Sequence, residues 1–326
     1  MRGMTHVFIN NIYRMISRIH YLFLSLGLTI AVMALAIFFT SQLEVEGRLA
    51  VVGEPGHLPA SVHEYRLESL EQVPPKSQLV RNKYDAVLID QGNGHYTVET
   101  IKGDEFKLKL QQALEHPGSP PPEEKRRGAA GQMLGFLTMI ILMGGLLFMT
   151  FFPEDKRNGT FRRLAVSPVR IGSYMIAQCL FCFAIIYVPT YGLIIAAHLL
   201  LHIDIGLSLL SYGWLLGLLA LLATAFAMFM TSWLEHNDNM LVLSGSLIVL
   251  TSLLSGSFYS FSPEGPMKWV TAVLPQKQFL TAVEGLEQHV PVVEWGGSVL
   301  YLLILSGGLL AAGWLICRRR LADGRY

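Results

Sequence analysis

Six stretches of the chain are nearly continuous runs of apolar residues that contain no Asp, Glu, Lys or Arg. They cover residues 21–40, 131–152, 173–197, 207–232, 240–258 and 296–317. Each run is about 20 residues long, which is enough for a helix to cross a hydrocarbon core of about 30 Å. The 25 basic and 24 acidic side chains all lie between the runs. This pattern predicts a mainly α-helical, multi-pass membrane protein with six transmembrane helices.

The distribution of basic residues predicts how the spans are oriented. If residue 1 lies in the cytoplasm, the inner segments hold 12 Lys and Arg residues, whereas the short outer loops hold only Lys268 and Lys277. Short cytoplasmic loops carry such an excess of positive charge, and the long segment 41–128 is exempt from this rule. We therefore expect both termini to be cytoplasmic.

The first 20 residues predict a helix that lies in the membrane interface. One face carries apolar residues at helical spacing: Phe8, Ile12, Met15, Ile16 and Ile19. Asn11, Arg14 and Arg18 share another face. Basic amphipathic helices of this kind lie flat on a membrane. The alternative is a cytoplasmic extension of the first span, residues 21–40, which we interpret as an uncleaved anchor.

Segment 41–128 has the composition of a small soluble domain and predicts an extracytoplasmic α/β fold. Residues 84–90 and 96–101 have strand patterns on either side of the turn sequence QGNGH. Residues 48–54 predict a further strand, and residues 105–115 predict a helix. The stretch HPGSPPPEEKRRG then reads as a linker into the second span, which opens the helical region 129–326.

Segment 259–295 is too polar to span and too apolar for a free loop. Two short helices interrupted at Pro275 are expected here. Non-helical backbone is tolerated at membrane depth only where protein or a water-filled cavity covers it. We therefore predict a re-entrant hairpin before the last span.

Small residues four apart mark sites of close helix packing. Gly213 and Gly217 have this spacing in the fourth span, and Ser252 and Gly256 in the fifth. Packing within the chain and packing against a partner subunit are both open. Cys179 and Cys182 lie in an apolar helix, which favours packing over redox or zinc chemistry. We therefore predict no metal site and no catalytic residue.

The stretch FFPEDKRNGTFRRLAVSPVR, residues 151–170, crowds charge into a connector between two spans. Asn158 or Thr160 can cap a short helix, Gly159 permits a sharp turn before it, and Pro168 ends it. Phe161 and Leu164 share its apolar face. Topology accounts for part of the positive charge. It does not account for the order of an acid pair, Gly-Thr and Ser-Pro.

This stretch resembles the cytoplasmic loop of membrane subunits of ABC exporters of the type-2 class. The shared pattern is an acid, then Gly-Thr, Leu, Ser-Pro and the next span, and the order of spans and external domain is also similar. In that family the loop forms a coupling helix that docks on a separate ATPase subunit. By match, the coupling residues are Asp155, Gly159, Thr160, Leu164 and Pro168, and we add their neighbours Glu154, Arg157, Phe161 and Arg163. Arg162 and Arg163 stand where many relatives carry an acid.

The resemblance implies a non-catalytic permease subunit with coupling loop 153–172 in a bacterial cytoplasmic membrane. The chain contains no Gly-Lys pair, so it lacks the G-x-x-x-x-G-K-[ST] phosphate-binding loop. ATP and magnesium are therefore expected on the partner ATPase, present in two copies. A second permease, identical or homologous, would complete the complex, and no nucleic acid is involved.

The spans suggest an amphipathic cargo. None of them holds an ionised residue, whereas carriers of ions or protons usually place one there. A drug, a peptide antibiotic or a lipid-like molecule would suit such a lining. Two alternatives are an antibiotic-sensing immunity protein whose external domain binds the ligand, and an ion-driven secondary carrier.

Overall fold

The computed structural model describes residues 2–43, 48–52, 66–70, 84, 86–90, 96–100, 111, 114, 128–165, 171–201, 206–234, 237–258 and 266–323. The chain divides into two compact units. The helical unit comprises Met1–Ile37 and Arg127–Tyr326, and the sheet unit comprises Phe38–Arg126.

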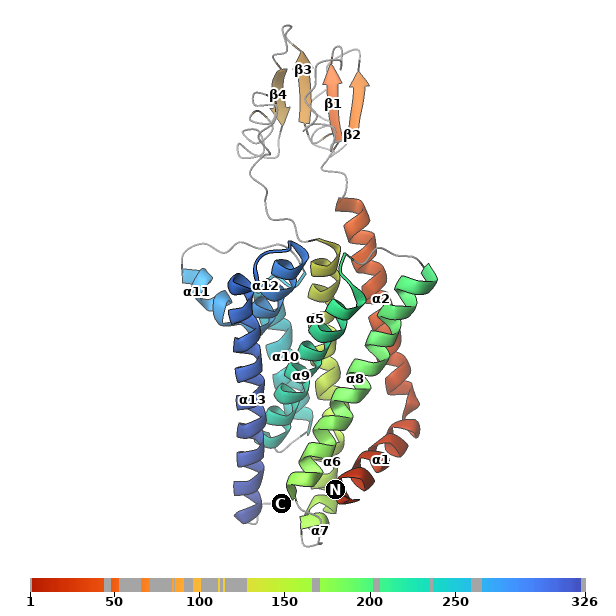
Figure 1. Ribbon diagram of the computed structural model, residues 1–326, viewed down its shortest axis with the longest axis vertical. Coiled ribbons are helices and arrows are strands. Elements are labelled where there is room, and N and C mark those ends of the chain that lie inside the picture. The colour runs from red at the N-terminus through yellow and green to blue at the C-terminus, as the bar shows by residue number, and fades with distance from the viewer. Residues whose placement is uncertain are drawn as a thin grey trace. The chain divides into compact units, whose positions relative to one another are not determined.

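The helical unit is a bundle of long helices with short helices at both ends (Figure 1). Its described elements are α1 (Arg2–Ile16), α2 (Ile19–Leu43), α5 (Ala129–Met149), α6 (Phe151–Arg157), α7 (Thr160–Ala165), α8 (Ile171–Leu201), α9 (Leu209–Trp233), α10 (Asn237–Leu254), α11 (Pro266–Val273), α12 (Pro275–Glu287) and α13 (Val292–Ala322). The α1 helix and the end of α13 both lie near α7, whereas α11 and α12 lie at the opposite end (Figure 1).

By length and apolarity, four of the described helices could cross a membrane. They are Ala129–Arg157, which joins α5 and α6, Ile171–Leu200, Leu209–Trp233 and Val292–Ala322. A fifth span is obtained if α1 and α2, which meet at a 78° bend, count as one. The predicted span 240–258 belongs to a shorter apolar helix, Asp238–Leu254. The described helices thus provide four or five spans by this measure, against the six predicted.

The core of the bundle is centred on α9, which packs against α5, α8 and α13. In α9, 72% of the residues in its 18-residue apolar stretch are buried within the chain, compared with 17% of those in the corresponding stretch of α13. Glycines bring the backbones together: a Cβ on Gly145 would lie 2.8 Å from the Ala223 carbonyl oxygen, and one on Gly313 would lie 3.2 Å from that of Met228. Because so little of α13 is buried within the chain, most of its surface stays available to lipid or to another subunit.

Two short helices lie on either side of Leu274. The first, α11, ends at Val273, and α12 begins with Pro275. Proline fits the first helical position because that position needs no N–H donor. Helix α12 packs against α13 and α5, and Tyr301 of α13 donates a hydrogen bond to the Val273 carbonyl oxygen (2.6 Å). The pair expected around Pro275 is present, and its re-entrant position in a membrane stays a prediction. Residues 259–265 of that predicted segment lie outside the described residues.

The sheet unit contains four described strands in the order β2-β1-β3-β4: β1 (Arg48–Val52), β2 (Arg66–Leu70), β3 (Ala86–Asp90) and β4 (Tyr96–Thr100). Strand β1 runs parallel to β2 and β3, whereas β3 and β4 form an antiparallel pair with Ala86 opposite Thr100. The strands β1, β3 and β4 fall in the stretches where the sequence predicts strands. Strand β2 was not anticipated because RLESL has no β-branched or aromatic residue. The predicted helix 105–115 lies outside the described residues except at 111 and 114, which are helical.

Candidate functional site

The charged connector folds as two short helices separated by a turn. Helix α5 passes into α6 at Thr150, whose hydroxyl donates to the Leu147 carbonyl oxygen (2.7 Å). Helix α6 ends at Arg157, and Gly159 adopts a φ of 68° before α7 begins. Glycine adopts this left-handed conformation without the steric penalty of a Cβ. The sharp turn predicted at Gly159 is therefore present. The expected helix terminator, Pro168, lies outside the described residues.

The acid pair of α6 points back to the N-terminal helix. Arg14 donates from Nη1 to Asp155 (2.9 Å) and from Nη2 to Glu154 (3.2 Å), and Arg18 donates to Glu154 (2.6 Å). Asp155 is only 6% exposed, and its second oxygen accepts a hydrogen bond from the Tyr174 hydroxyl of α8 (2.6 Å). The hydrogen bond to Glu154 raises the pKa of the Arg18 guanidinium. Both carboxylates are thus bound inside the chain.

An aromatic cluster fixes α7 to the same place. Phe161 is buried, and its ring lies 5.5 Å from that of Phe152 in α6 and 5.4 Å from that of Tyr174 in α8. The ring centroids of Phe152 and Tyr174 are themselves 6.0 Å apart. Aromatic pairs at these separations are attractive beyond the apolar area that they bury. Phe161 therefore anchors α7 to the bundle, and the charged residues that follow it are directed outward.

Helix α1 turns its polar face to the protein. Asn11 is buried and donates a hydrogen bond to Gln178 of α8, and Arg14 also lies over the ring of Phe151, 4.4 Å from its centroid. Of the residues predicted for the apolar face, Ile12 and Ile16 are exposed, whereas Met15 is buried and Phe8 packs against Phe181 of α8. The exposed apolar residues and the 78° bend into α2 suit a helix lying along a membrane surface better than a straight extension of a span.

Two basic residues bind the end of α9 that lies near α7. Lys156 donates to the Thr231 carbonyl oxygen, and Arg320 of α13 donates to that of Trp233 (2.7 Å). Positive charges stabilise a helix C-terminus because its last carbonyl groups are unpaired within the helix and carry partial negative charge. Lys156 thus joins the connector to the central helix of the bundle.

The outward side of the connector is basic. Arg157, Arg162 and Arg163 are exposed, whereas Glu154, Thr160 and Leu164 are half-buried. Among the described residues, Arg163 makes only long hydrogen bonds, of 3.4 and 3.5 Å, to Asn158 and Thr160 within the turn. We call Arg157, Arg162 and Arg163 the basic face, and Glu154, Asp155 and Phe161 the anchoring face. The predicted coupling residues are therefore divided between two sides of one segment.

The small residues predicted for helix packing have contacts within the chain. A Cβ on Gly213 would lie 3.1 Å from the Tyr191 hydroxyl of α8, and one on Gly217 would lie 3.6 Å from the Tyr187 ring. Ser252 is buried, and its carbonyl accepts a hydrogen bond from the Ser257 N–H in the turn that ends α10. Gly256 has a φ of 73° in that turn, as helix C-termini commonly require. A partner-subunit role for these four residues stays a prediction.

Several residues of this arrangement were not singled out from the sequence as site residues. Arg14, Arg18 and Tyr174 hold the acid pair. The two arginines are about 140 residues away from it in the sequence, and nothing in the sequence links them to it. At the other end of α5, Glu287 of α12 accepts hydrogen bonds from the backbone N–H groups of Ala130 (2.8 Å) and Gly131 (3.1 Å). Because this contact uses backbone donors, it has no side-chain pattern that a sequence could display.

The arrangement suits a mechanical role: a segment anchored to several helices presents a charged surface outward. Among the described residues, no group of three or more His, Cys, Asp or Glu side chains could hold a metal ion. Comparison with known proteins found no significant match to a curated protein sequence. A family model described as ABC-2 family transporter protein matches residues 65–315, which is most of the chain. Membership in this family implies an ABC transporter permease in a membrane, with an ABC ATPase as its partner. The chain belongs to the ABC-2 transporter family.

Proposed function

We propose that this chain is the permease subunit of an ATP-driven exporter and that its ATPase docks on the segment 154–168. The observation that carries the proposal is the division of this segment into two faces. Glu154, Asp155 and Phe161 are held inside the chain, whereas Arg157, Arg162 and Arg163 are exposed. An exposed basic surface on an anchored helix is suited to an acidic partner surface, because complementary charge directs and strengthens docking.

The anchoring contacts suggest how a push from the ATPase would spread. Phe161 contacts α6 and α8, the acid pair contacts α1, and Lys156 contacts α9. A displacement of α7 would therefore act directly on α6 and α8, and through α6 on α1 and α9, moving them as rigid elements. Closure of two ATPase subunits, each with bound ATP and magnesium, would supply the force.

A wide apolar groove supports a hydrophobic or amphipathic cargo. It has a volume of about 670 Å³ and lies between α8, α9 and α13. Its lining includes Met175, Phe183, Met228 and Trp314, and none of its described lining residues is Asp, Glu, Lys or Arg. A site of this kind would accept a drug, a peptide antibiotic or a lipid-like molecule and would disfavour an ion, because an unpaired charge is costly in an apolar site.

A second permease and a bacterial cytoplasmic membrane complete the proposal. Val242, Leu243 and Leu250 of α10 are exposed, which leaves an apolar face for a partner subunit or for lipid. The α1 helix and the end of α13 lie at the same end of the bundle as α7, which carries Arg162 and Arg163 (Figure 1). With the excess of positive charge there, this arrangement supports cytoplasmic termini.

The proposal is tested by affinity purification of the full chain from its native host in mild detergent. We expect an ATP-hydrolysing subunit to co-purify with it. Reversing the basic face, with Arg157→Glu, Arg162→Glu and Arg163→Glu together, should reduce the recovered ATPase by about tenfold or more. Because these side chains are exposed, the free energy of unfolding should change by only about 0.5 kcal/mol per substitution.

Arg319→Glu is the matched control, since Arg319 is also exposed at this end of the bundle but lies on α13. It should leave the recovered ATPase unchanged. Recovery of the ATPase at the wild-type level by the triple variant would refute docking at this face. If no ATP-hydrolysing subunit accompanies the wild-type chain, the permease assignment itself fails.

A further inference from the structure

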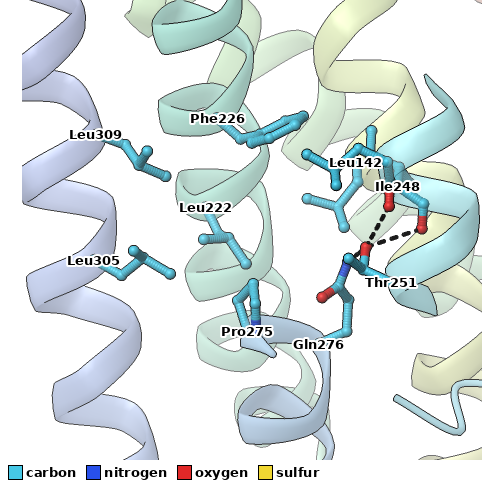
Figure 2. A pocket seen from close by; sticks show the side chains of 10 residues that line it. Leu142, Leu222, Phe226, Ile248, Thr251, Pro275, Gln276, Leu305 and Leu309 are labelled. Atoms are coloured by element: carbon cyan, nitrogen blue, oxygen red, sulfur yellow. Dashed lines mark hydrogen bonds between the residues drawn. The ribbon is translucent and has the colours of Figure 1, made fainter. Parts of the chain in front are cut away.

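A second cavity lies against the start of α12, where Pro275 and Gln276 contribute to its lining. It has a volume of about 130 Å³ and is lined by residues of α5, α9, α10, α12 and α13. Most of the lining is apolar and includes Leu142, Leu222, Phe226, Ile248 and Leu305. Figure 2 shows these side chains around Thr251 and Gln276, the polar residues of the lining.

The hydrogen bonds around Thr251 fix the orientation of the Gln276 side chain. The Thr251 hydroxyl donates to the carbonyl oxygens of Leu247 (2.7 Å) and Ile248 (3.2 Å) on its own helix. Its proton is therefore engaged, and Thr251 Oγ1 acts as the acceptor toward Gln276 Nε2 (2.6 Å). The amide must then direct its oxygen, Oε1, away from Thr251, into the space beside Pro275 (Figure 2).

Gln276 Oε1 is a buried acceptor whose hydrogen-bonding capacity is unused. The residue is only 3% exposed, and no donor among the described residues reaches this oxygen. An unpaired buried acceptor is costly, and an apolar residue of similar size would avoid that cost. The second position of α12 thus carries a polar group that is explained by a molecule able to donate to it.

We propose that this cavity binds a compact, uncharged molecule with a ring-sized apolar body and one hydroxyl donor, of the phenol class. The apolar body would contact the leucine and phenylalanine side chains, and the hydroxyl would donate to Gln276 Oε1. The volume is close to the roughly 150 Å³ of an apolar cavity known to hold benzene. In the part of the chain that the structure describes, no Asp, Glu, Lys or Arg lines the cavity, so a charged ligand would be left unpaired. This inference is independent of ATPase docking.

The test uses a matched pair of probes that differ in the donor alone, 4-fluorophenol and fluorobenzene. Binding to the detergent-solubilised full chain is measured by ¹⁹F NMR, with protein-free micelles as the blank. A single neutral hydrogen bond predicts that wild type binds 4-fluorophenol about three- to tenfold more tightly than fluorobenzene. The variant Gln276→Met, which keeps the size of the side chain, should bind both probes equally.

Gln278→Met is the matched control on the same helix. Gln278 donates to the Ala272 carbonyl oxygen and does not line the cavity, so the preference for 4-fluorophenol should persist. A second variant, Leu305→Trp, fills the cavity from a half-buried position and should abolish binding of both probes. The proposal is overturned if wild type shows no preference for the phenol, if Gln276→Met retains it, or if Leu305→Trp binds 4-fluorophenol as wild type does.

Discussion

The span formed by α5 and α6 is held at both ends by a short helix, but through different chemistry. At its beginning, the Glu287 carboxylate of α12 accepts hydrogen bonds from backbone N–H groups of Ala130 and Gly131. At its end, Arg14 and Arg18 next to the α1–α2 bend pair with the side chains of Glu154 and Asp155. The first contact depends on the unpaired N–H donors that every helix N-terminus has. The second contact depends on the identity of the charged side chains.

This difference shows which parts of each end can vary. A carboxylate that binds backbone requires small neighbours more than particular side chains, and a Cβ on Gly128 would clash with Glu287. An ion-pair junction requires every charged partner, because a buried carboxylate without its counter-ion is strongly unfavourable. We therefore expect the α6 end to tolerate substitution less than the α12 end.

The largest expected effect is that of Arg14→Glu. The new carboxylate would face Asp155, which is buried, and would also leave Glu154 without one of its partners. Breaking a buried pair costs about 3–5 kcal/mol, and we expect a loss of unfolding free energy at the lower end of this range because Arg14 is 24% exposed. Denaturant unfolding of the detergent-solubilised chain measures it.

The matched control for this prediction is Arg18→Glu. The Arg18 side chain is 41% exposed, so solvent screens its pair with Glu154 and the loss should be smaller. If Arg14→Glu unfolds at the wild-type midpoint, or if Arg18→Glu is the more damaging of the two, the ion-pair junction does not stabilise this end.

A smaller effect is expected at the other end from Glu287→Gln. The amide oxygen can still accept one backbone hydrogen bond, but the charge that favours a helix N-terminus is lost. We expect a loss of about 1–2 kcal/mol in the same unfolding assay. Glu294→Gln, at an exposed position in the first turn of α13, should cost less than about 1 kcal/mol. Equal losses in the two variants would contradict the role given to Glu287.

Sequence reasoning succeeded where a pattern is local. Charge-free runs marked the long helices, Pro275 marked the junction of α11 and α12, and Gly159 marked the turn before α7. It could not pair Arg14 with Asp155, because opposite charges far apart in a sequence give no sign of which ones meet. It grouped Asp155 with Arg163 as one docking surface because spacing alone does not show that Asp155 is buried against α1 and α8 while Arg163 is exposed.

The contact of Glu287 with α5 had no signal at all, since its partners are backbone groups that every residue except proline possesses. The cavity at Gln276 was equally hidden. A glutamine after proline at the start of a helix is unremarkable until the Thr251 hydroxyl fixes its amide.

The most direct test of the account is site-specific photo-crosslinking from the two faces of the connector. Benzoylphenylalanine is placed at position 163 of the basic face in one variant and at position 161 of the anchoring face in another. Both variants are irradiated in native membranes. We predict crosslinks to an ATP-hydrolysing subunit from position 163 and crosslinks only within the chain from position 161, where the ring is buried against α6 and α8. A crosslink to the ATPase from position 161 with none from position 163 would contradict the account.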